Sequence, residues 1–111
     1  MDIQITPSRG ATVVAVTGDL DTASARQMKQ TLNDLLDQGK TRIVVDLFGV
    51  GYIDSAGLGE LVRAMKRARN GAGDLRVCAL RGNVLRIFEL TRLNEGMGVY
   101  PTCREALAGW E

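Results

Sequence analysis

A run of five residues near the middle of the chain, Ile43-Val44-Val45-Asp46-Leu47, constrains the fold more than any other feature. It is rich in β-branched side chains and shows little alternation, which is typical of a strand buried on both faces. Such a strand belongs in a largely parallel sheet covered by helices. The chain has 111 residues, of which 45% are hydrophobic and 24% charged, enough for one core. We therefore expect residues 1–111 to form a single α/β domain.

The other apolar patterns place strands and helices around this run. A hairpin is predicted at the start of the chain, because Ile3 and Ile5 are separated from Val13–Val16 by the turn residues Pro7–Gly10. The further expected elements are a helix carrying Ala25, Met28, Leu32, Leu35 and Leu36, a helix from Ala56 to about Asn70, a strand over Leu75–Leu80, a helix bearing Val84, Ile87, Phe88 and Leu90, a short strand at Val99-Tyr100 and a final helix through Ala108. The sequence thus predicts a mixed, mainly parallel sheet with an N-terminal hairpin, flanked by about four helices.

Polar residues and glycines stand where these helices should begin or end. The expected N-caps are Asp21 or Thr22 for the first helix, Ser55 for the second, Asn83 for the third and Thr102 for the last, with Glu105 reaching back to complete a capping box. Gly39 is expected to end the first helix and Asn70-Gly71 the second.

Composition excludes several classes of function. The chain has no histidine, which removes Ser-His and Cys-His nucleophilic catalysis and argues against zinc sites. Cys78 and Cys103 lack CxxC or other metal-binding spacing, so we interpret both as reduced structural thiols. No metal and no cofactor are expected. The net charge of +1 gives no general attraction to nucleic acid.

Nothing in the sequence predicts membrane insertion. The longest apolar runs are only a few residues, far short of the roughly 20 that a transmembrane helix needs. The first residues, Met1–Gln4, show neither the basic region nor the apolar segment of a signal peptide, so we expect a cytoplasmic protein.

The segment "YIDSAGLG", Tyr52–Gly59, lies where a strand ends and a helix begins, the position at which open α/β sheets bind ligands and partners. Gly57 and Gly59 fall in the first helical turn, where each costs roughly 0.5–1 kcal/mol relative to alanine. Two explanations stay open for them: access for a partner's backbone or a phosphate, and close packing of the helix on the sheet.

Catalytic interpretations of this segment are weak. A nucleophile elbow would need glycine where Ile53 stands, and the spacing of a phosphate-binding loop is absent. A receiver-type site, with Asp54 accepting phosphate beside Asp19 and Asp21 around Mg²⁺, remains as a minority hypothesis.

Three segments carry a resemblance to a known family: "VTGDLD" (16–21), "IVVDLFGVGYIDSAGLGELV" (43–62) and "LRVCALRGNVLRIFELTRL" (75–93). They resemble the STAS domains of bacterial anti-sigma factor antagonists, over nearly the whole chain. Asp19 stands where many members have glutamate, and Ala56 where some have serine. The resemblance implies a non-enzymatic regulator that binds an anti-sigma factor serine kinase when unphosphorylated and is released when phosphorylated. A PP2C-type phosphatase would reset it.

Carried over by motif, the phosphorylated residue is Ser55. The partner surface implied by the resemblance and the junction comprises Asp19, Asp21, Asp54, Ala56, Gly57, Leu58, Gly59 and Arg63. Arg63 belongs to a basic helix face with Lys66, Arg67 and Arg69, which either steers a partner or is simply solvated. The alternative function is a STAS subunit of a transporter or stress-sensing complex that binds its neighbours without a sigma cycle.

Overall fold

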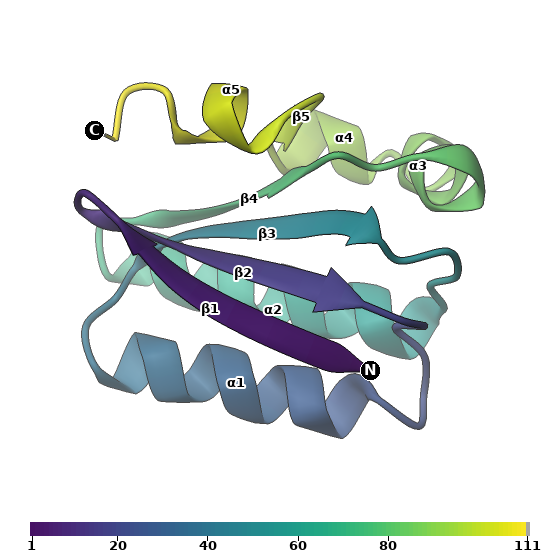
Figure 1. Cartoon of the computed structure of the whole chain (residues 1–111), viewed down its shortest axis with the longest axis horizontal. Coiled ribbons are helices and arrows are strands. Elements are labelled where there is room, and N and C mark those ends of the chain that lie inside the picture. Colours follow the sequence, from purple (N-terminus) through teal and green to yellow (C-terminus); the bar gives the residue numbers. More distant parts are fainter. Residues whose placement is uncertain (111) are drawn as a thin grey trace.

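The sheet of this protein has five strands whose spatial order follows their order in the chain, β1-β2-β3-β4-β5. The computed structural model describes residues 1–110. Its elements are β1 (Asp2–Ser8), β2 (Ala11–Thr17), α1 (Ala25–Asp37), β3 (Arg42–Gly49), α2 (Ser55–Asn70), β4 (Asp74–Cys78), α3 (Gly82–Leu90), α4 (Leu93–Gly96), β5 (Val99–Tyr100) and α5 (Cys103–Leu107). β1 pairs with β2 in antiparallel register, and the other three pairings are parallel. The predicted mixed, mainly parallel α/β sheet with its N-terminal hairpin is confirmed (Figure 1).

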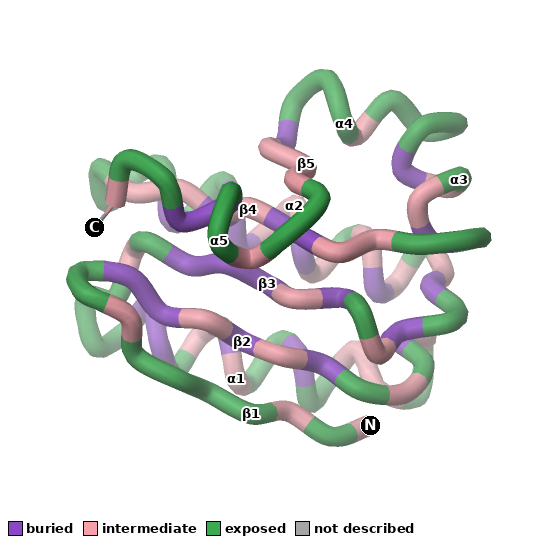
Figure 2. Tube along the Cα trace, turned by 45° about the horizontal axis from the view of Figure 1, so that its top comes forward, coloured by how far each residue is buried: buried purple, intermediate pink, exposed green. Residues whose placement is uncertain are grey.

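β3 is the central strand, as its apolar run predicted. It pairs with β2 on one side and β4 on the other, and Ile43, Val44, Val45 and Leu47 are all fully buried. β1 is an edge strand and is mostly exposed along its length, in contrast to the buried middle of the sheet (Figure 2). A strand whose side chains are buried on both faces of the sheet needs cover on both faces, and the helices supply it.

α1 and α2 lie side by side on one face of the sheet, below the strands in Figure 1. Their buried residues, among them Leu32 and Leu61, pack with alternate residues of β2, β3 and β4 into the main core. Val84 and Phe88 of α3 join the same core. The opposite face carries a smaller apolar cluster, where Ala106 and Leu107 of α5 pack on Val44 and Cys78.

The helix ends correct some predictions and confirm others. Ser24, not Asp21 or Thr22, precedes α1, and Arg81, not Asn83, precedes α3; neither makes a side-chain cap hydrogen bond. α4 is a short helix that the periodicity missed, because four residues are too few to show a helical repeat.

Three predicted helix ends are confirmed, and one of them is Asn70-Gly71 at the end of α2. Gly39 ends α1 with φ +80°, and the amides of Gly39 and Lys40 donate to the carbonyls of Leu36 and Leu35 in the paired pattern of a Schellman motif. Thr102 caps α5, its Oγ1 accepting from the Glu105 amide at 3.1 Å, but within residues 1–110 the Glu105 carboxylate makes no return hydrogen bond to the Thr102 amide, so only half of the predicted capping box forms.

Candidate functional site

Two loops, one after β2 and one after β3, are joined at the carboxyl end of the sheet. The amide of Gly18 donates to the carbonyl of Gly49, and the amide of Leu20 donates to the carbonyl of Tyr52, both at 3.0 Å. Leu20 and Ile53 form an isolated parallel bridge and are 0% and 1% exposed. The pairing of β2 with β3 therefore resumes beyond the strand ends and brings the loop before α1 against the start of α2.

Asp54 is the N-cap of α2 and also ties the two loops together. Its Oδ1 accepts from the amides of Ala56 at 3.0 Å and Gly57 at 3.1 Å. Its Oδ2 accepts from the amide of Thr22 at 2.9 Å and from the Thr22 hydroxyl at 3.0 Å. The Gly57 amide, followed by the Thr22 and Ala56 groups, holds the pKa of this carboxyl below its ordinary value although partial burial opposes the shift. Both carboxylate oxygens are therefore engaged in holding the junction.

The prediction that Ser55 caps α2 is wrong, because Asp54 occupies that role. Ser55 is instead the first residue of the helix and its side chain is exposed. Among the hydrogen bonds within residues 1–110, none involves the Ser55 hydroxyl. This exposed hydroxyl therefore does not help to hold the junction together.

The two glycines of the first helical turn have different surroundings. A Cβ built on Gly57 would lie 2.4 Å from the Leu20 carbonyl oxygen and 3.1 Å from Cγ1 of Ile53. A Cβ built on Gly59 would meet nothing within 4 Å. Gly57 thus permits close packing of α2 on the adjoining loop, whereas Gly59 leaves open space on the surface. The close-packing explanation therefore holds for Gly57, and it does not apply to Gly59.

Asp19 and Asp21 lie in the loop that pairs with this junction. Asp21 is half-buried, and its Oδ1 accepts from the Ser24 amide at 3.1 Å. Asp19 is exposed, and its carbonyl accepts from the Ser24 hydroxyl at 2.8 Å. Within residues 1–110 these two carboxylates and that of Asp54 do not converge on a common metal position. The arrangement gives no support to a receiver-type Mg²⁺ site.

The remaining predicted residues lie along the same helix. Ala56 and Leu58 are half-buried, and Leu58 packs against the main core. Arg63 is held within the chain, since Nη2 is 2.9 Å from Glu60 Oε2 and Nη1 donates to Asn33 Oδ1 at 3.0 Å.

Other arginines of the basic helix face are also paired with acids of this chain. Arg67 forms an ion pair with Asp37 of α1, and Arg69 Nε lies 2.8 Å from Asp74 Oδ1. Much of the positive charge on this face is therefore compensated, which favours the solvated interpretation over partner steering.

Sequence reasoning missed the roles of four residues at this end of the sheet. Phe48 and Tyr52 are large side chains that are 64% and 50% exposed, and they precede Ser55 by seven and three residues. Arg81 holds the Phe48 position, as its Nε donates to the Phe48 carbonyl at 2.6 Å and its guanidinium lies 5.0 Å from the ring centroid. Thr22 was considered only as a cap for α1. The available signal for the aromatic pair was that the two residues flank the glycine-containing segment Gly49-Val50-Gly51.

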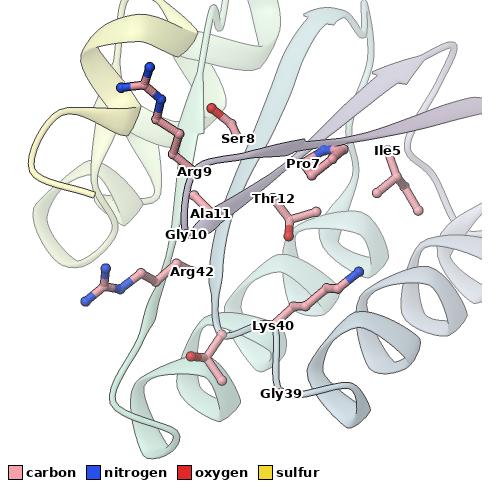
Figure 3. Close-up of a pocket in the computed structure, with 11 residues that line it drawn as sticks. Ile5, Pro7, Ser8, Arg9, Gly10, Ala11, Thr12, Gly39, Lys40 and Arg42 are labelled. Atoms are coloured by element: carbon pink, nitrogen blue, oxygen red, sulfur yellow. The ribbon is translucent and has the colours of Figure 1, made fainter. Parts of the chain in front are cut away.

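A cavity of about 440 Å³ lies at the other end of the sheet, away from this junction. It is bounded by the hairpin turn between β1 and β2 and by the residues that lead into β3, and it includes the cations Arg9, Lys40 and Arg42 (Figure 3). Because β3 runs from this end toward Ser55, the two regions are separated by the length of the strand.

Comparison with known proteins identifies this architecture. A family model described as the STAS domain matches residues 2–106. The chain belongs to the STAS domain family. Two relatives of this STAS domain are named as anti-sigma factor antagonists. BtrV of Bordetella bronchiseptica, whose name describes it as a candidate antagonist, is 32% identical over 101 residues, covering 89% of this chain and 84% of BtrV. The anti-sigma-B factor antagonist of Staphylococcus aureus is 31% identical over 86 residues, covering 78% and 80%.

Solved structures share the fold of this STAS domain. The crystal structure of a candidate anti-sigma factor antagonist from Thermotoga maritima has a TM-score of 0.92 at 23% identity, covering 97% of this chain and 93% of the other. The Bacillus cell fate determinant SpoIIAA in its phosphorylated form has a TM-score of 0.74 at 22% identity, covering 96% of each chain. Between residues 1 and 110, no helix combines the length and apolar character needed to span a bilayer.

Proposed function

We propose that this STAS domain is an anti-sigma factor antagonist that binds a serine-kinase anti-sigma factor and is released when the kinase phosphorylates Ser55. A PP2C-type phosphatase then removes the phosphate and restores binding. The named antagonists among its relatives support the regulatory class. The choice of Ser55 rests on the geometry of the junction.

The proposal rests on the different roles of Asp54 and Ser55 at the start of α2. A capping serine is a poor kinase substrate, because its oxygen is engaged by backbone amides and its modification breaks the cap. Here Asp54 supplies the cap and Ser55 is exposed at the first helical position. The hydroxyl is available for phosphoryl transfer without loss of a fold-stabilising contact.

A phosphate on Ser55 would remain an unneutralised charge. Of the first amides of α2, those of Ala56 and Gly57 donate to the Asp54 carboxylate, and that of Leu58 donates to the Asp54 carbonyl. The helix N-terminus therefore has few free donors for a second anion. The added charge of about −1.5 to −2 at neutral pH would face outward, toward any partner docked on this surface.

The expected effect on affinity is large enough for a switch. A partner carboxylate about 6 Å from the phosphate, at an effective dielectric constant near 20, repels each unit of charge by roughly 3 kcal/mol. That energy corresponds to about a hundredfold loss of affinity. Electrostatic repulsion thus suffices without a conformational change in the domain.

The proposed docking surface lies at the carboxyl end of the sheet and includes Ser55. It combines the exposed Asp19 and the open surface at Gly59 with the exposed rings of Phe48 and Tyr52. Exposed aromatic residues commonly supply most of the energy of protein interfaces. Asp21, Asp54 and Gly57 support this surface by shaping the loops beneath it.

The direct test is phosphorylation of the purified protein by its cognate anti-sigma kinase with ATP, followed by mapping of the phosphate by mass spectrometry. Kinase affinity is measured in parallel for the wild type, Ser55→Ala and Ser55→Asp. We expect phosphate on Ser55, tight binding for Ser55→Ala, and weakened binding for Ser55→Asp. Ser8→Asp is the matched control, since it adds the same charge at the hairpin end of the sheet.

Phosphate on another residue with Ser55 unmodified would refute the site assignment. Equal affinities of the wild type, Ser55→Ala and Ser55→Asp would refute the switch. Either result, together with stable binding to a transporter or stress-complex subunit, would favour the alternative of a binding module without a sigma cycle.

A further inference from the structure

A second cluster of reactive side chains lies on the sheet face that α5 covers. Asp46 of β3, Cys78 of β4 and Cys103 of α5 each place one potential ligand atom within 4.8 Å of the other two. The Cys78 and Cys103 sulfurs are 3.2 Å apart, and Cys103 Sγ is 3.7 Å from Asp46 Oδ2. This is the one such cluster among residues 1–110, and the proposed function does not use it.

The fold assembles this cluster from distant parts of the chain. Asp46 and Cys78 are direct neighbours in the parallel register of β3 and β4, so their side chains leave the same face of the sheet. Cys103 is the first residue of α5, which packs against β3, β4 and β5 on that face. Cys103 is 25 residues from Cys78 and 57 from Asp46, which explains why no motif was visible in the sequence.

The distances suit a tetrahedral cation. With Zn–S bonds of about 2.3 Å and a Zn–O bond of about 2.0 Å, two tetrahedral sulfur ligands lie about 3.8 Å apart and a sulfur and an oxygen about 3.5 Å apart. The observed separations of 3.2 Å between the sulfurs and 3.7 Å between Cys103 and Asp46 differ from these values by roughly half an ångström or less. The Cys78 sulfur and the Asp46 carboxylate, which lie within 4.8 Å of one another, would close on the ion as it binds. Cys78 is fully buried, whereas Asp46 and Cys103 are half-buried, so a fourth position can face solvent.

The carboxylate is oriented before any ion arrives. Asp46 Oδ1 accepts from the Phe48 amide at 2.9 Å, which leaves Oδ2 directed at Cys103. Such a second contact is the usual way in which proteins orient a metal ligand. A disulfide between the two cysteines would make no use of this carboxylate. A cation uses all three groups.

We propose that Asp46, Cys78 and Cys103 form a binding site for a divalent cation of the zinc class, with water as the fourth ligand. Binding replaces two S–H bonds by two metal–sulfur bonds and releases both protons to solvent, with no change of oxidation state. Thiolate sulfur selects zinc over magnesium or calcium, which prefer oxygen ligands. The inference does not depend on the proposed function.

The ion would fasten α5 to the sheet. α5 has five residues, too few to be stable as an isolated helix, and its first residue would become a ligand joined to β3 and β4. Because the ion binds only the folded arrangement, it also raises the stability of the whole domain.

The test uses the full chain, reduced with a phosphine and freed of metal, titrated with Co²⁺ and then Zn²⁺. We expect one ion per chain, a thiolate-to-cobalt charge-transfer absorption that Zn²⁺ abolishes, and slower amide hydrogen exchange in α5. Cys103→Ala and Cys78→Ala should lose the absorption. Asp46→Asn keeps an oxygen for the Phe48 amide and should weaken Zn²⁺ binding at least about tenfold. Glu105→Gln on α5 removes one negative charge, as Asp46→Asn does, and should bind Zn²⁺ like the wild type.

The proposal is overturned if the reduced wild-type chain gives no thiolate absorption with Co²⁺ and retains no Zn²⁺ after desalting. It is equally overturned if folded Cys103→Ala binds Zn²⁺ as tightly as the wild type. Should a cysteine variant fail to fold, the Asp46→Asn and Glu105→Gln pair decides, because equal affinities would exclude Asp46 as a ligand. Formation of an intramolecular disulfide with hydrogen peroxide, without zinc uptake by the reduced chain, would identify a redox pair instead.

Discussion

The two glycines of α2 provide the sharpest test of how this junction is packed. The perturbation is one added methyl group, in Gly57→Ala or in Gly59→Ala. Alanine is more favourable than glycine in a helix by roughly 0.5–1 kcal/mol, and both positions lie in the same helical turn. Helix propensity alone therefore predicts that both substitutions stabilise the protein by similar amounts.

Packing reverses the expectation at Gly57 only. The new methyl group would lie 2.4 Å from the Leu20 carbonyl oxygen and 2.8 Å from Leu20 Cγ, so α2 or the loop must move by about 1 Å. The carbonyl cannot yield freely, since it accepts from the Asp54 amide at 3.2 Å. Overpacking of this kind costs typically 1–3 kcal/mol. At Gly59 the methyl group meets nothing within 4 Å, so only the propensity gain remains.

The difference between the two variants isolates the packing cost, because the propensity gain is common to both. We expect Gly57→Ala to be less stable than Gly59→Ala by about 1–3 kcal/mol in urea denaturation, with unchanged m-values. Gly59→Ala should exceed the wild type by up to about 1 kcal/mol. If both variants shift the urea midpoint upward by the same amount, the close approach of α2 to Leu20 is not a feature of the protein, and the account of the junction is wrong.

Three further predictions test other parts of the structure. Hydrogen bonds lower the pKa of Asp54 from 3.8, so its contribution to stability is complete above that pH and is lost as pH falls through the folded-state value. The difference in urea midpoint between the wild type and Asp54→Ala should therefore be constant near neutral pH and shrink below pH 3.8. A difference that persists in strong acid would contradict this. Thr102→Ala should lower the free energy of unfolding by about 0.5–2 kcal/mol and speed amide exchange in α5, because the cap on the Glu105 amide is lost. An equal loss of stability in Glu105→Ala, which keeps that amide and its cap, would argue against the cap. Phe88→Ala should lower the free energy of unfolding by about 3–5 kcal/mol in the same denaturation assay, because Phe88 is fully buried. Leu90→Ala on the same helix should change it by no more than about 0.5 kcal/mol, because Leu90 is 74% exposed. Similar losses for the two variants would mean that the face of α3 carrying Phe88 is not the one in the core.

Much of the fold was predictable because its signals are local. The buried run at Ile43–Leu47 requires neighbours on both sides and cover on both faces, and β3 has them. The turn residues between β1 and β2, the helical repeat of α1 and α2, and Gly39 at the end of α1 were read correctly for the same reason. Each of these features depends on residues close together in the chain.

The start of α2 was placed correctly, but its cap was assigned to the wrong residue. The D-S pair marked the start of α2, yet both Asp54 and Ser55 are favourable N-caps, and local preference does not distinguish them. The neighbouring loop does, because Thr22 binds Asp54 Oδ2 and holds the carboxylate over the helix end. The roles of the two glycines were likewise open until Leu20 was found against one of them.

The order of strands and helices and the central position of β3 are determined by the sequence alone, because apolar periodicity and turn chemistry act over a few residues. The family was also recognisable from the sequence, through the resemblance of three of its segments to STAS domains. Only the tertiary structure decided that Asp54 rather than Ser55 caps α2 and that Gly57 packs against the neighbouring loop. It alone also brought the side chains of Asp46, Cys78 and Cys103 together. Those outcomes depend on residues that are 25 to 57 positions apart in the chain, and only strand register and helix docking bring them into contact.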